Sequence, residues 1–413
     1  MNRREFIKLA GISSLSLMIP GLRCLALDST QKQTDRRLIV ILLRGAVDGL
    51  SIVAPYADSL YYDLRPQIAV APPGSEGGLI KLDNHFGLHP ALEPLLPVWQ
   101  EKKLAFFHAS GSPDPTRSHF QAQDYRETGM PGKRALTTGW LNRVVSHLAL
   151  KDAPIKALNI GPVLPRIFSG PAQIATITSR VEPVKSSLDN PAIQSLFHDL
   201  YSNQQDELCR AFQEGLTARN EINKDLKAAD SDKEQLSANH GAPLLRSNDP
   251  WGRQLAKLLR RAPFIRVVFL DFGGWDTHVA QGAGRGNLAR RLAPLGGGLT
   301  DLINGLGPLF HDTTIVVMSE FGRTDKQNVN NGTDHGHGNV IWLMGGTIPG
   351  GKVYGRWSGL AANALYEQRD LPITTDFRSI LSAVLSEQVG IAKKDLGEIF
   401  PNFQGKGNPF IQA

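Results

Sequence analysis

The chain has 413 residues, of which 41% are hydrophobic and 20% are charged, a composition typical of a globular protein with one large domain or two ordinary ones. The net charge is +6, but residues 1–26 hold four basic side chains and one acidic one, so the remainder carries only +3. This small excess has no stripe of Lys and Arg interleaved with aromatic residues, and it gives no support for a nucleic-acid partner.

The N-terminus, "MNRREFIKLAGISSLSLMIPG", has the order of features found in an export signal. Arg3 and Arg4 precede an apolar run that is too short to span a bilayer, and small residues allow cleavage after Ala26. The pattern resembles a bacterial twin-arginine signal, although an amphipathic N-terminal helix would also fit. We therefore expect transport by the twin-arginine translocase to the periplasm or the extracellular space, and no membrane span in the mature chain.

The chain contains only two cysteines, Cys24 and Cys209, and cleavage after Ala26 would leave Cys209 alone. An exported protein without disulfides depends on its hydrophobic core for stability. Cysteine-rich zinc motifs are excluded.

Six short apolar runs predict the strands of a buried, mostly parallel sheet, because they are continuous, rich in β-branched residues and bounded by turn residues. They are "RLIVILLRG", "KLAFFHASG", "IKALNIG", "IRVVFLDFGG", "TTIVVMSEFG" and "VIWLMGG". Helical patterns lie between them, in "HPALEPLLPVWQEKK" and in the glycine-interrupted "LARRLAPLGGGLTDLINGLGPLF". This alternation predicts an α/β fold of three layers, with helices on both faces of the sheet.

The polar stretch at about residues 180–250 predicts a helical insertion or cap within this domain, which we expect to cover residues 36–413 as a single unit. The charged side chains of the stretch are those of a solvated surface.

Ligands of open α/β sheets bind beyond the carboxyl ends of the strands, and five segments at the predicted strand ends carry acidic or imidazole side chains. The candidate metal ligands are Asp48, Asp276, His278, Glu320, His335 and His337. Such ligands suit one or two divalent ions of zinc, manganese, iron, calcium or magnesium. Each residue also has an ordinary explanation, since Asp48 could cap a helix and Asp276 and His278 could be hydrogen-bonded loop residues.

The segment "DPTRSHF" contains a candidate nucleophile. A hydroxyl at a helix start, beside Arg117, suits attack on a tetrahedral anion, because the helix N-terminus and the guanidinium both favour negative charge. A nearby metal would lower the pKa of the hydroxyl. Ser118 could equally be an ordinary N-cap.

Taken together, "LLRGAVDGLSIVAPY", "GSPDPTRSHFQAQDY", "FGGWDTHVAQGAG", "VVMSEFGRT" and "NGTDHGHGNV" resemble the domain-of-unknown-function 1501 family of bacteria. The resemblance runs from about Leu38 to the end of "TTDFRSILSAVL". It implies export by the twin-arginine route and an alkaline-phosphatase-like fold, which is shared with sulfatases and cofactor-independent phosphoglycerate mutases.

The resemblance also implies roles for individual residues. Sulfatases carry a Cys/Ser-x-Pro-Ser-Arg signature at the nucleophile, and "PDPTRS" is similar, but Pro113 stands at the nucleophile position and leaves Thr116 or Ser118 as substitutes. The superfamily motif Ser-Asp-His-Gly reads Ser-Glu-Phe-Gly here, so Glu320 could ligate a metal while Phe321 could not. The second histidine of "DHGHG" would then replace the missing imidazole, or only one metal would bind.

Three functions fit these observations. The first is an exported, metal-dependent hydrolase of phosphate or sulfate esters, with Ser118 or Thr116 as the nucleophile and Arg117 or Arg323 holding the anionic substrate. The second is a non-catalytic envelope protein, for binding or assembly, that retains the fold. The third is a metal-dependent mutase or transferase. A fold alone does not decide between them.

Overall fold

The computed structural model describes residues 36–133, 136–148, 155–177, 242–405 and 410, all within one unit, Asp35–Ala413. The expected signal at residues 1–26 lies outside this described part, as does all of the expected insertion except residues 242–250. None of the described helices is both long and apolar enough to cross a membrane.

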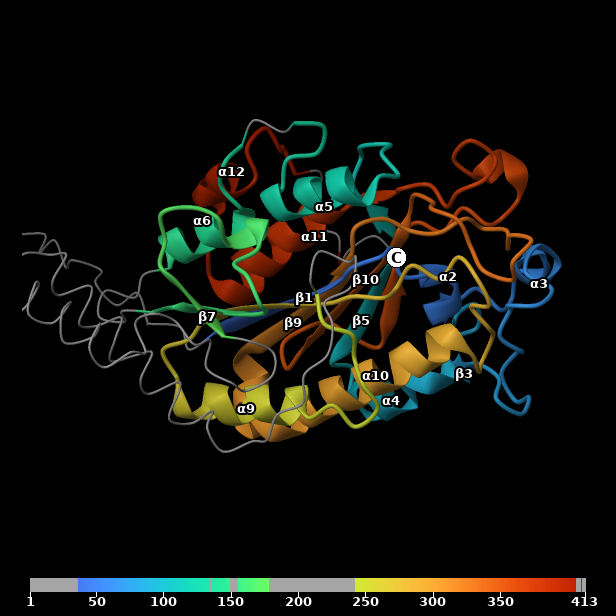
Figure 1. The fold of residues 1–413 in the computed structure, drawn as a ribbon, viewed down its shortest axis with the longest axis horizontal. Coiled ribbons are helices and arrows are strands. Elements are labelled where there is room, and N and C mark those ends of the chain that lie inside the picture. Colours follow the sequence, from blue (N-terminus) through green and yellow to red (C-terminus); the bar gives the residue numbers. More distant parts are fainter. Residues whose placement is uncertain (1–35, 134–135, 149–154, 178–241, 406–409, 411–413) are drawn as a thin grey trace, which may run out of the picture. The chain divides into compact units, whose positions relative to one another are not determined.

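A sheet of nine strands forms the middle layer of the described part (Figure 1). Its strand order is β11-β5-β10-β9-β1-β8-β6-β7, and β12 also pairs with β5. The strands are β1 (Arg37–Leu43), β5 (Leu104–Gly111), β6 (Ala157–Ile160), β7 (Ile174–Ile177), β8 (Val267–Phe272), β9 (Thr313–Ser319), β10 (Asn339–Gly345), β11 (Lys352–Tyr354) and β12 (Thr375–Asp376). All six predicted runs are strands of this sheet.

The direction of β10 determines where the functional loops meet. β1 pairs in parallel with β8 and β9, whereas β10 runs antiparallel to both β9 and β5. The loop that precedes β10 therefore lies at the same edge as the loops that follow β1, β5, β8 and β9. The sheet is mostly parallel, as expected, and this one reversed strand brings a fifth loop to its carboxyl edge.

Helices cover both faces of the sheet (Figure 1). One face carries α5 (His119–Thr128), α6 (Trp140–His147), α11 (Phe377–Ala383) and α12 (Leu396–Ile399). The other face carries α4 (Leu96–Gln100), α9 (Trp251–Arg261) and α10 (Asn287–Leu306). The expected three-layer α/β architecture is confirmed.

The two faces have separate hydrophobic cores, and β1 contributes to both because its side chains alternate between the faces. Ile39 and Ile41 pack in the core with α9 and α10, whereas Leu38 and Val40 pack in the core with α6 and α11. Every residue of β1 is buried, as expected of a central strand covered on both sides.

Shorter elements surround the sheet. They are the helices α2 (Gly49–Ile52) and α3 (Ser59–Leu64), a small sheet of β2 (Val53–Ala54), β4 (Gly87–Leu88) and β3 (Ile80–Lys81), the 3₁₀ turns η2 (Pro90–Leu95), η3 (Arg166–Phe168), η5 (Gly307–Asp312), η6 (Ala362–Ala364) and η8 (Lys393–Asp395), and a π-helical turn, η7 (Val384–Val389). The predicted helical pattern before β5 is thus a 3₁₀ turn followed by α4.

α10 is one continuous helix of 20 residues despite three consecutive glycines and an internal proline. Its glycines allow α9 to approach very closely. A Cβ at Gly298 would lie 2.0 Å from Nε1 of Trp251, and a Cβ at Gly252 would lie 1.8 Å from the carbonyl oxygen of Gly298. The low helix propensity of glycine is therefore offset by the packing that it permits.

We expect Gly298→Ala to lower the free energy of unfolding by about 1–3 kcal/mol, because the added methyl group must displace the buried Trp251 ring. Gly297→Ala is the matched control, since a Cβ there meets nothing within 4 Å. It should raise the stability by about 0.5–1 kcal/mol through helix propensity. Urea unfolding of both variants measures the difference, and equal effects would refute the close-packing explanation.

Candidate metal centre

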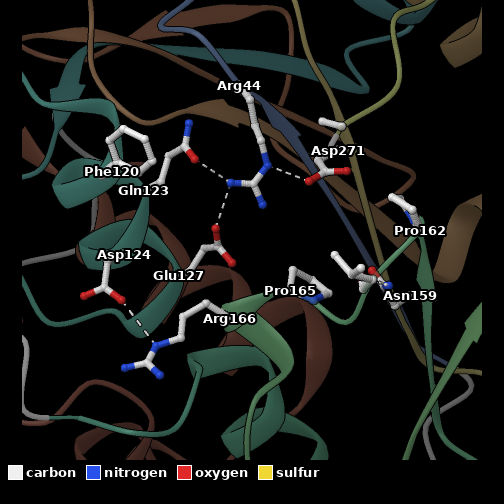
Figure 2. Close-up of a pocket in the computed structure, with 12 residues that line it drawn as sticks. Arg44, Phe120, Gln123, Asp124, Glu127, Asn159, Pro162, Pro165, Arg166 and Asp271 are labelled. Atoms are coloured by element: carbon white, nitrogen blue, oxygen red, sulfur yellow. Dashed lines mark hydrogen bonds and ion pairs between the residues drawn. The ribbon is translucent and has the colours of Figure 1, made fainter. Parts of the chain in front are cut away.

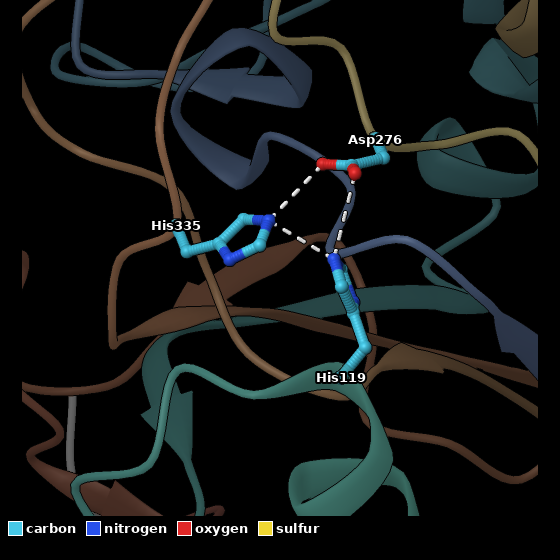
Figure 3. A group of neighbouring side chains, drawn as sticks. All are labelled: His119, Asp276 and His335. Carbon is cyan, nitrogen blue, oxygen red and sulfur yellow. Dashed lines mark hydrogen bonds and ion pairs between the residues drawn. The ribbon is translucent and has the colours of Figure 1, made fainter.

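Three side chains from distant parts of the chain meet at the carboxyl edge of the sheet (Figure 3). His119 is the first residue of α5, Asp276 follows β8, and His335 precedes β10. One potential ligand atom from each lies within 4.8 Å of the other two. The Nε2 atoms of the two histidines are 3.0 Å apart, and the carboxylate oxygens of Asp276 lie 3.3 Å from His335 Nε2 and 3.5 Å from His119 Nε2.

A fourth side chain, His278, touches this group. Its Nε2 lies 3.0 Å from His335 Nε2 and 3.0 Å from Asp276 Oδ1. Ligand atoms that surround a tetrahedral zinc ion at about 2.0–2.1 Å are separated by roughly 3.4 Å. The observed separations are therefore close to those of a metal-ligand set.

The other ring nitrogen of each histidine already faces an oxygen. His119 Nδ1 lies 2.8 Å from Glu320 Oε1, His335 Nδ1 lies 3.0 Å from the Arg117 carbonyl oxygen, and His278 Nδ1 lies 3.2 Å from Asp334 Oδ1. An oxygen acceptor favours the tautomer in which Nδ1 carries the proton, which leaves the lone pair on Nε2. Three Nε2 lone pairs that face one another repel unless a proton or a cation lies among them. The donor set of this site therefore fits a metal ion.

Glu320 contacts Nδ1 of His119, the ring nitrogen that faces away from the cluster. Its carboxylate is fully buried and accepts hydrogen bonds from the Gly45 backbone N–H at 2.8 Å and from the Gln123 amide at 3.0 Å. Burial raises the pKa of Glu320, but the hydrogen bond and the positive charge of His119 outweigh burial and lower the pKa to about 2. Glu320 is thus an anion that orients the imidazole, as in many carboxylate–histidine–metal arrangements.

Asp276 is also held as an anion. Burial raises its pKa, but hydrogen bonds with His119 and His335, together with the charge of Arg323, keep the pKa well below its usual range. The Arg323 guanidinium is fully buried and donates to Asp276 Oδ1 and to the Ala46 carbonyl oxygen. Arg323 therefore fixes one carboxylate oxygen at the cluster.

Glycines allow the loops on either side of this cluster to touch. Gly322 N–H donates to the His337 carbonyl oxygen and Gly336 N–H donates to the Gly322 carbonyl oxygen, at 2.9 and 2.8 Å. A Cβ at Gly322 would lie 1.8 Å from the Gly338 carbonyl oxygen, and one at Gly336 would lie 2.3 Å from the Arg323 carbonyl carbon. The "SEFG" and "DHGHG" motifs thus form one backbone unit that places His335.

The structure brings some of the predicted ligands together and separates others. Asp276 and His335 lie in the cluster, and His278 and Glu320 contact it. Asp48 is buried elsewhere, in an ion pair of 2.6 Å with Arg65 that outweighs burial and lowers its pKa.

His337 also points away from the cluster. Its ring stacks on Tyr366 with the ring centroids 4.6 Å apart, and burial lowers its pKa to about 4.

The predicted nucleophiles and anion-binding residues lie beside the cluster. Thr116 donates its hydroxyl to Gln121 at 2.7 Å. Ser118 occupies the N-cap position of α5, but its exposed side chain makes no capping hydrogen bond. Arg117 forms ion pairs of 2.6 Å with Asp370 and 2.7 Å with Glu367.

His119 belongs to the cluster but is absent from the candidate ligands that the sequence interpretation named. It stands in "DPTRSHF", directly after Ser118, whereas the sequence interpretation offers either the second histidine of "DHGHG" or a single metal ion to explain the missing imidazole at Phe321. In the structure the His119 ring lies against Phe321, with centroids 5.0 Å apart. Its position at a helix start, beside a predicted strand end, was the available signal.

Several solved structures are similar to this chain at low sequence identity. A sulfatase from Pseudoalteromonas sp., PsFucS1, is 14% identical over 100% of this chain and 77% of that one, with a TM-score of 0.41. The C-terminal periplasmic domain of EcEptC from Escherichia coli, in complex with Zn, is 10% identical over 91% of this chain and 90% of that one, with a TM-score of 0.40. A protein in the alkaline phosphatase superfamily from Vibrio parahaemolyticus is 12% identical over 91% and 72% of the two chains, with a TM-score of 0.37.

No curated protein matches the sequence. One family model, described as "Protein of unknown function (DUF1501)", matches residues 35–400. That match covers most of the chain and agrees with the resemblance seen in the sequence motifs, so the protein belongs to the DUF1501 family.

Proposed function

We propose that this protein is a metal-dependent hydrolase of phosphate or sulfate esters. The observation that carries the proposal is the convergence of imidazole Nε2 atoms on Asp276 at separations of 3.0–3.5 Å, while each Nδ1 is held by an oxygen. Imidazole nitrogens gathered around one carboxylate, with an oxygen behind each ring, are typical of metal ligands.

One ion would be held by His119, Asp276 and His335, with His278 as a further ligand. A set of several imidazoles and one carboxylate favours zinc or manganese over calcium and magnesium, which prefer oxygen ligands. Asp48 and His337, which a second ion would require, are engaged elsewhere, and the cluster above is the one such group in the described residues. The bound ion would polarise an ester oxygen and stabilise charge on the leaving group.

Ser118 is the nucleophile that we favour over Thr116. It precedes the ligand His119, its side chain is exposed, and its hydroxyl has no hydrogen-bond partner among the described residues. The Thr116 hydroxyl is already used as a donor to Gln121. The hydroxyl of Ser118 also lies at the N-terminus of α5, where the helix dipole favours an anionic ester group.

We also propose that the protein works outside the cytoplasm, in the periplasm or the extracellular space, after export by the twin-arginine translocase. The sequence of residues 1–26 supports this location. The route carries folded proteins, so the ion could be bound before export.

A second candidate function is non-catalytic binding or assembly. It is favoured by the ion pairs of the two arginines that would otherwise bind an anionic ester. Arg117 is paired with Asp370 and Glu367, and Arg323 is buried against Asp276. In a binding protein these ion pairs would be purely structural.

The metal assignment predicts that His119→Ala and His335→Ala abolish zinc binding. Glu320→Gln should weaken it by roughly 10–100-fold, because Glu320 only orients His119. His337→Ala is the control and should bind zinc normally, since its ring lies on Tyr366. Chelator competition with metal analysis measures the affinities, and equal losses in the His337 and His119 variants would exclude the assigned site.

Zinc binding should also depend on pH. Burial lowers the pKa of His119, but hydrogen bonds with Asp276 and Glu320 outweigh burial and raise the pKa to about 9 in the protein without an ion. At pH 8 the ring is protonated and must lose a proton to bind zinc.

The affinity should therefore rise with pH, by up to about tenfold per unit, as pH increases from 7 towards 9. Calorimetry at pH 8 in buffers with different ionisation enthalpies should show about one proton released per ion. Glu320→Gln removes an anionic partner of His119 and should reduce this release. An affinity that does not change over this pH range would contradict the protonation state assigned to His119.

The nucleophile assignment predicts that Ser118→Ala reduces hydrolysis of the best substrate by at least roughly 1,000-fold, with metal content unchanged. Thr116→Ala should retain most activity. A panel of phosphate monoesters, phosphate diesters and sulfate esters identifies that substrate. Full activity in both variants would eliminate a side-chain nucleophile here, and a zinc-loaded protein that hydrolyses none of the esters would favour the second candidate function.

A further inference from the structure

A cavity of about 390 Å³ lies against α5, the helix that also carries His119 (Figure 2). Its walls come from the ends of β1, β6 and β8 and from the α5 residues Phe120, Gln123 and Glu127. Its size is within the range of roughly 300–1,000 Å³ found for small-molecule sites. None of the proposed metal ligands lines it.

The floor of the cavity is polar, and its arrangement is rigid. The Arg44 side chain is almost fully buried and donates to Asp271 at 2.5 Å, to Gln123 at 2.7 Å and to Glu127 at 2.9 Å. These bonds use Nε and Nη1. The remaining nitrogen, Nη2, has no hydrogen bond to any described residue and faces the open space beyond Glu127 (Figure 2). A ligand thus meets a fixed donor beside fixed carboxylate acceptors.

The charges around the cavity disfavour an anionic ligand. The lining contains two basic side chains, Arg44 and Arg166, and three acidic ones, Asp124, Glu127 and Asp271. Asp124 pairs with Arg166 at 3.2 Å, while Arg44 is shared by the other two carboxylates. The formal count thus has one more carboxylate than arginine, and burial raises the pKa of Glu127. The lining therefore offers no net positive charge to attract a phosphate or sulfate group.

The rim of the cavity is apolar. Phe120 is 70% exposed and Val163 is 63% exposed, and Pro162 and Pro165 also line the cavity. These side chains offer an apolar surface to a ligand beside the polar groups of the cavity, a combination found in small-molecule sites. A polyhydroxylated ring, which has C–H bonds on its face and hydroxyl groups at its edge, matches both the apolar rim and the polar floor. Its face can pack on Phe120, and its hydroxyl groups can donate to the carboxylates and accept from Arg44.

The cavity is joined to the metal cluster through α5. The Gln123 side chain accepts from Arg44 in the cavity and donates to Glu320, which orients His119. Phe120 directly follows His119. A molecule could therefore extend from one site to the other around the first turn of the helix.

We propose that this cavity binds an uncharged, polyhydroxylated group, such as a sugar ring, that belongs to the same ester whose anionic group is bound at the metal. The inference rests on the proposed function for the identity of that ester. Substrate selection would then depend on opposite preferences at the two sites, with an anion at the metal and an uncharged polyol in the cavity.

Titration of neutral monosaccharides against the protein, followed by ligand-observed NMR, tests the cavity directly. Glucose, galactose, mannose and fucose are the probes, each measured with and without zinc. At least one should bind in both preparations, because no proposed metal ligand lines the cavity. Phe120→Ala should weaken its binding by at least fivefold, whereas Val329→Ala, which removes an apolar side chain that is 97% exposed and outside the cavity, should leave it unchanged.

The sulfated form of the same sugar should bind more weakly than the neutral form when zinc is absent, and more strongly when zinc is present. Lack of binding by every neutral sugar would overturn the inference, even if zinc binding and ester hydrolysis hold. Unchanged binding in Phe120→Ala would also overturn it. If a neutral sugar binds the cavity but no zinc binds the cluster, the cavity assignment stands and the proposed hydrolase fails, so the two failures are distinguishable.

Discussion

Three histidine Nε2 atoms and the Asp276 carboxylate face the same small volume, and the rest of the site is arranged around that constraint. The Nδ1 atom of each ring lies within hydrogen-bond distance of an oxygen, which belongs to Glu320, Asp334 or the Arg117 backbone. Lone pairs at these separations are stable only around a cation or a shared proton. The hydrogen bonds behind the rings therefore serve to preserve a geometry that a bound ion would complete.

The sheet topology makes this geometry possible. β10 is antiparallel to β9 and β5, so the residues before it meet those that follow the parallel strands. Gly322 and Gly336 then let the two neighbouring loops touch backbone to backbone. A side chain at either position would separate the loops and move His335 away from Asp276. The glycine content of these motifs is explained by this close approach.

Buried polar contacts connect the metal cluster to the cavity beside α5. Arg44, Gln123, Glu320 and His119 form a continuous chain of hydrogen bonds, with fully buried Glu320 at its centre. Networks of this kind are rigid when every member has its partner. The same helix thus carries a proposed metal ligand, His119, and part of the cavity wall. This arrangement would couple recognition of an anionic group to recognition of an uncharged one.

The sequence by itself determined the α/β class, the six main strands and the edge at which the functional loops gather, because continuous apolar runs and turn residues are local signals. It also identified Asp276, His278, Glu320 and His335 as residues at that edge. Only the tertiary structure decided which of them meet. Asp48 forms an ion pair with Arg65, and the His337 ring stacks on Tyr366, whereas His119 lies in the cluster at the start of α5. These outcomes depend on ion pairs, ring packing and helix placement between residues far apart in the chain, and no local pattern encodes such contacts.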